Sequence, residues 1–176
     1  MPTNKIISFV IDGEVTRQQI GVYVIIAKSK IGNSFKLYIG KTGDNREGCN
    51  PIISRIGNHF SLNRIHSQMR NKLSVNLEEM EFEIIFRPFF NYTEIEKYRL
   101  KESIGIINEM ERQLNLKLQK LVIGYKNSEI INKYFGKGYI NKSERLVRKS
   151  YLTGRREEIL SDIVNFIKQK INTEYN

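Results

Sequence analysis

The sequence predicts an α+β fold, in which a small three-stranded antiparallel sheet is flanked by helices and followed by a mainly helical, basic C-terminal extension. Runs of β-branched and aromatic residues bounded by turn formers predict the strands. Apolar residues that recur every three or four positions predict the helices. A length of 176 residues allows a single domain.

The first two strands are predicted to form a hairpin. Residues 21–27, GVYVIIA, are β-branched and aromatic, and the turn formers of IGNSF separate them from a second such run, KLYIG, at 36–40. The stretch that follows holds too many turn formers for regular structure. Asn50-Pro51 then suits a helix start, and the apolar spacing predicts a helix over 51–62.

A third strand and a long helix are expected in the middle of the chain. Residues 63–73 form a second short helix, and 81–90, EFEIIFRPFF, form a strand whose proline indicates an edge or an end. Thr93 and Glu96 resemble a capping box. The next helix is therefore predicted over 93–114, with Asn115 closing it. Its apolar residues at helical spacing are Ile104, Ile107, Met110 and Leu114.

The pattern weakens toward the C-terminus. We expect a strand or extended piece near 116–125, a helix near 127–135 and a final amphipathic helix over 155–171. The apolar face of the last helix is interpreted as core rather than as a partner-binding stripe. It consists of Ile159, Ile163, Phe166, Ile167 and Ile171.

Positive charge is concentrated in the last third of the chain. The 29 Lys and Arg residues exceed the 19 Asp and Glu residues by ten, with an excess of three over residues 1–116 and seven over 117–176. Such a field attracts polyanions, nucleic acid first and an acidic membrane surface second, although biased composition is the alternative explanation. No run approaches the roughly 20 apolar residues of a membrane span, and no helix is strongly lipid-like, so no membrane partner is expected.

A cytoplasmic location is expected from two features. The start MPTNKIISFV carries a short apolar run without a small-residue cleavage site, which makes it a poor secretory signal. The single cysteine, Cys49, excludes an internal disulfide framework, in line with a reducing compartment. No role is assigned to Cys49 or to His66.

Several short motifs occur in an order that points to one chemistry. GVY at 21–23 and YIG at 38–40 lie on the paired strands, Arg55 and His59 share a helix face four residues apart, and Glu102 lies in the next long helix. The joint pattern resembles the GIY-YIG nuclease family, with valine in place of the first isoleucine. The resemblance covers about residues 15–120, the expected nuclease core.

The resemblance implies a metal-dependent hydrolysis of phosphodiester bonds. It implies that Glu102 holds Mg²⁺ or Mn²⁺, because a hard cation that keeps its waters needs only one or two protein carboxylates. Tyr23 would help to deprotonate the attacking water, and Arg55 would bind the scissile phosphate through two oxygens. The implied catalytic set is Tyr23, Tyr38, Lys41, Arg55, His59, Glu102 and Asn115.

The remaining members have less defined roles. Tyr38 would orient water or phosphate, Lys41 would serve as a second cation or a proton acceptor, and His59 would relay a proton or bind phosphate. Each residue taken alone has a structural interpretation. The tyrosines are then cross-strand aromatics, Arg55 and His59 a solvated helix face, and Glu102 a surface carboxylate.

The family includes repair, homing and junction nucleases as well as restriction endonucleases. Only residues 121–176 follow the core, as a basic extension for DNA recognition or dimerisation, with no zinc-binding cysteines and no clear helix-turn-helix. The first hypothesis is a Type II restriction enzyme acting on double-stranded DNA. A palindromic target would favour a two-fold homodimer. The expected DNA-binding residues are Arg145, Arg148, Lys149, Arg155 and Arg156, around Tyr151.

Two other functions stay open. The first is a phage or mobile-element endonuclease of the homing or nicking type. The second is a nucleic-acid-binding module that kept the fold without cleavage, although the joint presence of the tyrosines, arginine and glutamate speaks against it.

Overall fold

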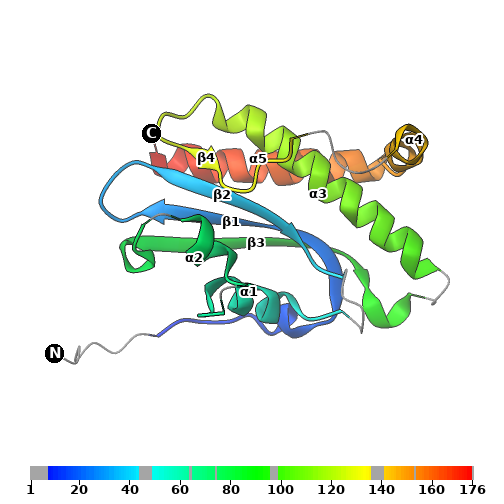
Figure 1. Cartoon of the computed structure of the whole chain (residues 1–176), viewed down its shortest axis with the longest axis horizontal. Helices are drawn as coiled ribbons and strands as arrows, with labels where there is room; N and C mark the ends of the chain where they lie inside the picture. The colour runs from blue at the N-terminus through cyan, green and yellow to red at the C-terminus, as the bar shows by residue number, and fades with distance from the viewer. Residues whose placement is uncertain are drawn as a thin grey trace.

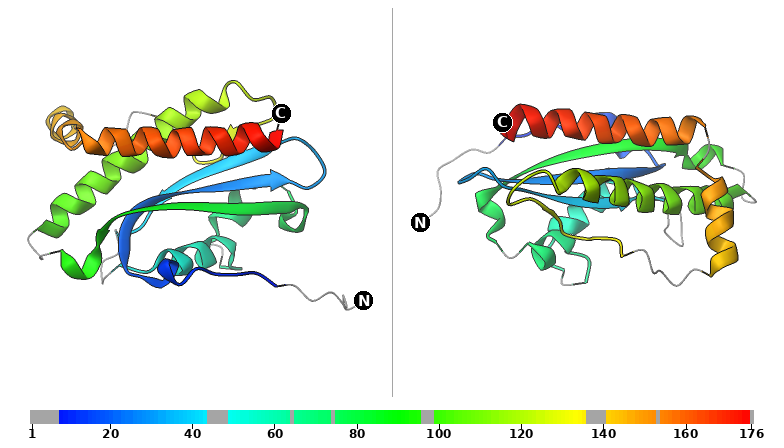
Figure 2. Two further views of the ribbon diagram at one scale, coloured as in Figure 1. Left: turned by 180° about the vertical axis from the view of Figure 1, so that it is seen from behind. Right: turned by 90° about the horizontal axis from the view of Figure 1, so that it is seen from above.

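A four-stranded sheet lies between two layers of helices (Figures 1 and 2). The computed structural model describes residues 8–43, 49–63, 65–73, 75–95, 99–135, 141–152 and 154–175. The strands are β1 (Gln19–Ser29), β2 (Phe35–Lys41), β3 (Met80–Asn91) and β4 (Glu129–Ile130). The helices are α1 (Ile52–Phe60), α2 (Gln68–Lys72), α3 (Leu100–Val122), α4 (Lys142–Ser150) and α5 (Arg155–Tyr175). Short 3₁₀ turns cover Gly13–Thr16, Leu77–Glu79 and Tyr92–Glu94.

The sheet has the strand order β3-β1-β2-β4 and is mixed. The α+β class and the central hairpin are as predicted: β1 pairs antiparallel with β2 and with β3. The prediction of three antiparallel strands is wrong in one respect, because β4 adds a parallel neighbour to β2, with Leu37 opposite Ile130. A strand of two residues is too short to show an alternating pattern. It therefore left no signal in the sequence.

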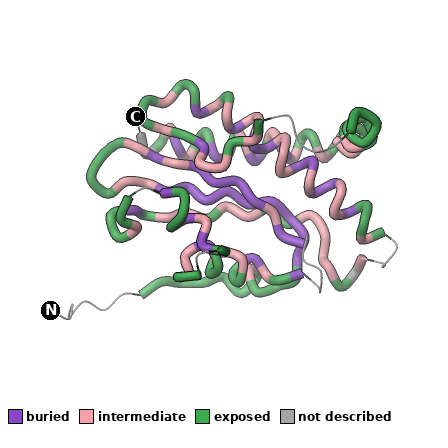
Figure 3. Tube along the Cα trace, in the orientation of Figure 1, coloured by how far each residue is buried: buried purple, intermediate pink, exposed green. Residues whose placement is uncertain are grey.

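The side chains of β1 alternate between two apolar layers. Val22, Val24 and Ile26 point to the face covered by α3 and α5, while Ile25 and Ala27 point to the face covered by α1 and α2. Burial on both faces explains why β1 is apolar almost throughout instead of alternating with polar residues. Figure 3 shows this buried band along the centre of the sheet.

The predicted elements before α3 are close to the observed ones. α1 begins one residue after Pro51, and α2 occupies the second half of the stretch 63–73. β3 is an edge strand, as the proline indicated, and its Pro88 lies opposite Gly21 next to an irregularity in the register. Residues 44–48, within the turn-rich stretch before α1, lie outside the described residues.

α3 differs from its prediction at both ends. Thr93 belongs to a 3₁₀ turn and the cap of α3 is Arg99, while Glu96 of the expected capping box lies outside the described residues. The helix does not end at Asn115 but continues to Val122, so the extended piece near 116–125 is wrong. Leu118 and Val122 are both buried and continue the apolar stripe of the helix at intervals of four. The helix expected near 127–135 is also wrong, because that stretch holds β4 and irregular chain.

α5 is part of the main core, as its apolar spacing predicted, except at Phe166, which is 47% exposed. Its side chains Leu160, Ile163, Ile167 and Ile171 belong to the same buried cluster as the inner residues of β1 and α3. Lys170 also reaches β3, where its Nζ lies 2.6 Å from an Oε1 of Glu83. None of the helices in the described ranges combines the length and hydrophobicity that a transmembrane span requires.

We predict that truncating α5 on its sheet-facing side will destabilise the whole domain. Ile167→Ala should lower the free energy of unfolding by about 2–5 kcal/mol, because Ile167 is fully buried and its loss leaves a cavity. Phe166→Ala is the matched control: the neighbouring side chain is larger but 47% exposed, so its loss should cost less than about 1 kcal/mol. Chemical denaturation of both variants measures the difference. Equal costs would show that α5 does not depend on the sheet.

Candidate active site

Tyr23 and Tyr38 lie on the same face of the hairpin, directed toward α1. Tyr23 is opposite Gly40 and Tyr38 is opposite Ile25, so the two tyrosines are diagonal neighbours across β1 and β2. Their ring centroids are 6.3 Å apart and the rings are nearly parallel. The sequence motifs on the two strands therefore meet, as the resemblance implied.

Gly40 provides the space in which the Tyr23 ring lies. A Cβ at position 40 would be 2.8 Å from Cε1 of Tyr23 and nearer still to Cζ and the phenol oxygen. Ordinary contacts of a Cβ begin at 3.4 Å, so even a methyl group does not fit. The glycine of the YIG motif thus allows the ring of Tyr23 to lie flat across the neighbouring strand. Gly21 has the corresponding role toward β3, where a Cβ would be 2.9 Å from Cα of Pro88.

His59 joins the two tyrosines from α1. Its Nε2 is 2.5 Å from the Tyr23 hydroxyl, and its ring packs edge-on against Tyr38 at a centroid distance of 4.7 Å. Arg55 lies one turn earlier on α1, as the spacing predicted. His59 Nδ1 is buried and has no hydrogen-bond partner among the described residues. Among the described residues, the imidazole therefore forms one hydrogen bond, with the Tyr23 hydroxyl.

Burial keeps both members of this pair neutral. It raises the pKa of Tyr23 well above its ordinary value, and the charges of Tyr38 and Glu111 act in the same direction, while Arg55 opposes them. Burial also lowers the pKa of His59 to about 4, and the Arg55 guanidinium adds to this effect. At neutral pH the pair thus shares a hydrogen bond between a protonated phenol and an uncharged imidazole. Such an imidazole can accept a proton.

Lys41 connects the hairpin to α3 on the opposite face of the sheet. Its Nζ donates to Oδ1 of Asn108 at 2.6 Å and lies 3.4 Å from Oε2 of Glu111. Asn108 and Glu111 are three residues apart and share one face of α3. The Lys41 side chain is 18% exposed and that of Glu111 29%, so both retain access to solvent. Neither Asn108 nor Glu111 was among the residues predicted from the sequence.

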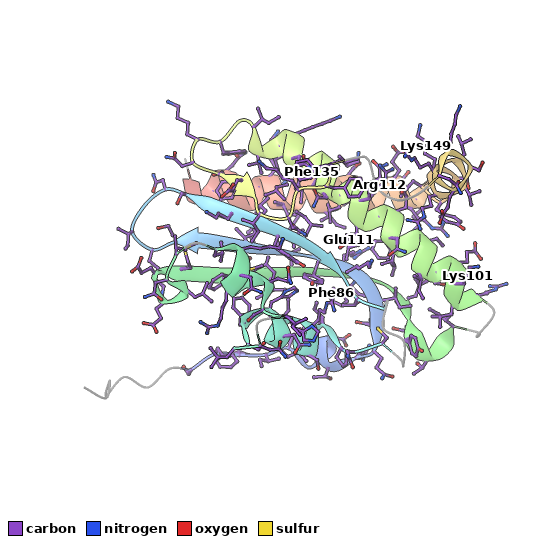
Figure 4. All side chains as sticks on the ribbon, in the orientation of Figure 1. Phe86, Lys101, Glu111, Arg112, Phe135 and Lys149 are labelled. Atoms are coloured by element: carbon purple, nitrogen blue, oxygen red, sulfur yellow. The ribbon has the colours of Figure 1, made fainter. Side chains whose placement is uncertain are left out.

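The carboxylate that contacts Lys41 is Glu111, whereas the predicted Glu102 lies elsewhere on α3. Nine residues separate them, which in an α-helix is about two and a half turns and about 13 Å, on opposite faces. Glu102 is exposed in the first turn of α3 and lines a cavity between α3 and α4. In Figure 4, Glu111 lies between α3 and the sheet, whereas Lys101, next to Glu102, lies near the outer end of the helix.

Asn115 has a structural position. It is buried, and its Nδ2 donates to the carbonyl of Asn132 at 3.0 Å while its Oδ1 accepts from the backbone N–H of Tyr134 at 3.0 Å. Asn132 in turn bonds both the N–H and the carbonyl of Ile39 through its side chain. Asn115 therefore fixes the chain after β4 against β2.

The expected DNA-binding residues lie apart from this cluster, on α4 and at the start of α5. α4 carries Arg145, Arg148 and Lys149 and has no buried residue, so it is exposed on almost every side (Figure 3). Arg148 pairs with Glu144 at 3.2 Å. Tyr151 does not project outward with them but packs on α3, where a Cβ at Gly105 would be 3.1 Å from its ring. The first turn of α5 holds Arg155 and Arg156, and Arg156 donates to the Tyr151 carbonyl.

The candidate active site combines a cation from β2, a carboxylate from α3, and a proton acceptor and a guanidinium from α1, and these are Lys41, Glu111, His59 and Arg55. Metal ions of the magnesium type accept such a single carboxylate, and no group of three potential metal ligands occurs in the described ranges. No protein-family model matches the chain, and neither the curated proteins nor the solved structures contain a match. The residues themselves are thus the basis for a functional proposal.

We predict that Gly40→Ala will disrupt the site. The added methyl must displace the Tyr23 ring, which should cost about 1–3 kcal/mol of stability and abolish the contact with His59. Gly57→Ala is the matched control, because Gly57 lies in α1 with nothing within 4 Å of the added methyl, and alanine should stabilise a helix by about 0.5–1 kcal/mol. Thermal unfolding measures both changes. A neutral Gly40→Ala variant would refute the close packing.

The stability of the protein should fall as the pH decreases from 6.5 to about 4. The unfolded chain takes up a proton on His59 near pH 6.5, whereas the folded chain resists this uptake until about pH 4, so acid favours unfolding over that window. His59→Gln should remove this part of the pH dependence. His66→Gln is the matched control, because His66 is exposed and is the only other histidine. Denaturation at pH 7, 6 and 5 tests this, and an unchanged slope in His59→Gln would contradict it.

Proposed function

We propose that this chain is a metal-dependent endonuclease that hydrolyses phosphodiester bonds in double-stranded DNA. The observation that carries the proposal is the proximity of two groups across the paired strands β1 and β2. Tyr23, His59 and Arg55 lie on the α1 side and Lys41 and Glu111 on the α3 side, near enough for the charges of Arg55 and Glu111 to act on Tyr23. These residue types supply what phosphodiester hydrolysis requires: a cationic phosphate ligand, a proton acceptor for water and a carboxylate for a divalent ion. The resemblance of the motifs to the GIY-YIG nucleases supports the same chemistry.

Glu111 is the residue that would hold a divalent cation. It is a carboxylate with remaining solvent exposure, and one carboxylate beside a substrate phosphate is enough for Mg²⁺ or Mn²⁺, which keep several of their waters. When bound, the ion would neutralise charge on the phosphate and stabilise the leaving oxygen. The proposal therefore moves the metal-holding role from Glu102 to Glu111.

The charged residues would bind and orient the phosphate. Arg55 offers a guanidinium that can hold two phosphate oxygens and does not lose its charge near neutral pH. Lys41 contributes a second cation, whose ammonium is held in place by Asn108 and Glu111. Tyr38, beside His59, would help to position the water or the phosphate.

The Tyr23–His59 pair would remove the proton from the attacking water. A water oxygen attacks phosphorus and the bridging P–O bond breaks, while the water proton passes to the Tyr23 oxygen and the phenol proton passes to Nε2 of His59. This relay avoids a free phenolate, which the raised pKa of Tyr23 disfavours. The neutral imidazole, with a pKa of about 4, is available as the acceptor at neutral pH.

Sequence-specific cleavage of the restriction type is part of the proposal. α4 exposes both cations and apolar side chains, with Leu146 62% and Val147 53% exposed. Cations position a protein on the DNA backbone, whereas apolar and polar contacts with base edges read sequence. A two-fold dimer would place one active site on each strand. A homing or nicking activity would use the same cluster without a fixed palindromic site.

We predict that Glu111→Gln will lower metal-dependent cleavage of plasmid DNA by about 100-fold or more while duplex binding persists, because the variant removes the metal carboxylate and retains the cations. Glu102→Gln is the matched control: the same change, on the same helix and on the opposite face, should leave the rate unchanged. Supercoil relaxation with Mg²⁺ and with a chelator measures the rates.

The reverse ranking, with Glu102→Gln inactive and Glu111→Gln active, would contradict the assignment of the carboxylate. A wild-type protein that binds DNA tightly and never cleaves it would favour the non-catalytic module. Tyr23 and His59 are only 1% and 3% exposed, and this near-complete burial is the observation that favours a non-catalytic nucleic-acid-binding module.

A further inference from the structure

A buried ion pair on α3 is directed away from the active-site cluster. Glu109 is only 2% exposed, and its carboxylate accepts hydrogen bonds from Nε of Arg112 at 2.7 Å and from the side-chain amide of Gln113 at 2.9 Å. A second nitrogen of Arg112 also bonds this carboxylate, so the pair is bidentate. These hydrogen bonds raise the pKa of Arg112, which keeps its charge.

Arg112 is thereby held in one orientation. Two of its nitrogens are bound to Glu109, and the guanidinium lies over the Tyr134 ring at 5.8 Å. A guanidinium fixed by a carboxylate beneath it and an aromatic ring beside it loses little conformational entropy when it binds an anion. The side chain of Arg112 is still 24% exposed. It can therefore present its remaining N–H groups to a ligand.

α4 surrounds this guanidinium with further cations. A cavity of about 250 Å³ lies between α3 and α4 and is lined by Arg112 and Tyr134 together with Lys142, Arg145, Arg148 and Lys149 of α4. Five basic side chains thus line a cavity whose one carboxylate, that of Glu109, is already bound to Arg112. Figure 4 shows Arg112 on α3 and Lys149 on the crossing helix α4. The excess positive charge predicts an anionic ligand.

The position of the cavity indicates which anion it takes. Arg112 directly follows Glu111, so the two side chains leave neighbouring positions of α3 about 100° apart. Arg148 lines this cavity and also the adjoining one, of about 600 Å³, which Asn108 lines as well. Asn108 in turn bonds Lys41 of the active-site cluster. The cations of α4 are therefore linked through Asn108 to Lys41 of the active site, which suits one extended polyanion.

We propose that the cavity of about 250 Å³ between α3 and α4 is a phosphate site built on the Glu109–Arg112 pair. It would hold a backbone phosphate of the DNA beside the cleaved bond. The proposal rests on the proposed function for its choice of DNA as the source of the phosphate. Arg112 and Lys142 join the binding surface expected from the sequence. Glu109 is a positioning residue, since it acts through Arg112 and not on the ligand.

The first experiment tests the phosphate chemistry without DNA. Inorganic phosphate is titrated into the full-length protein at constant ionic strength against chloride, and the Nε–H signal of Arg112 is followed by NMR, assigned by its loss in Arg112→Lys. A saturable shift of this signal supports the site. A linear drift, equal to the one that chloride produces, would overturn it.

The second experiment separates orientation from charge. Glu109→Gln and Glu144→Gln both add one positive charge, so simple attraction predicts that both bind a duplex equally well or more tightly than the parent. We expect Glu109→Gln to bind the duplex at least about five-fold more weakly than the parent, because Arg112 loses its bidentate support. Glu144→Gln affects only the pair with Arg148 and should bind the duplex no more weakly than the parent. Fluorescence anisotropy of a labelled duplex in a chelator measures both. Equal affinity of the two variants would refute the positioning role.

A third variant keeps the test independent of the buried pair. Lys142→Gln removes an exposed cation of the cavity and should reduce the slope of log affinity against log salt by about 0.9, as for one lost phosphate contact. Lys126→Gln, an exposed lysine beyond the end of α3, should leave the slope unchanged. An unaltered slope in Lys142→Gln would contradict the site. Because these measurements involve no cleavage, a protein that binds phosphate here but cuts no DNA would refute the proposed function and not this inference.

Discussion

The close approach of the Tyr23 ring to the backbone of Gly40 is the contact on which the rest of the site depends. It requires an antiparallel hairpin in a fixed register, because a slip of one residue would move Tyr23 to the other face of the sheet. The same register directs Tyr38 toward His59 and leaves Lys41 at the end of β2, facing α3. The glycines of the two motifs on the paired strands are therefore required for packing, in addition to any chemical role of the motifs.

Three sides of α3 make different contacts. Its apolar side, with Met110, Leu114 and Leu118, packs on the sheet and α5, and the adjoining side carries Glu111 toward Lys41. A third side carries Arg112 toward α4. The residues that were predicted to cap this helix of 23 residues do not cap it. The helix is stable because its stripe of apolar side chains is buried along the whole length. The polar sides are then free to serve the active site and the basic cavity.

The sequence was sufficient for the hairpin, the edge strand and α1, since all of these follow from local motifs and short periodicities. The hydrogen bond between Tyr23 and His59 was not predicted. It was not sufficient for the choice among the glutamates of α3. That choice depends on which side of α3 faces the sheet. Helix geometry places Glu102 and Glu111 on opposite sides, but it does not say which of the two sides faces the site. β4 and the ion pair of Glu109 depend on contacts between elements, which leave no local pattern. The apolar face of the last helix was predicted to be core, and Ile163, Ile167 and Ile171 are buried, whereas Phe166 is 47% exposed.

The most direct test of the proposed nuclease is to incubate the purified protein with phage or plasmid DNA, with Mg²⁺ and with chelator, and to sequence every new end. We predict discrete ends that appear only with the metal and share one short sequence motif. Tight binding of the same DNA without any metal-dependent ends would contradict the central claim that the cluster around Tyr23, Arg55 and Glu111 is catalytic.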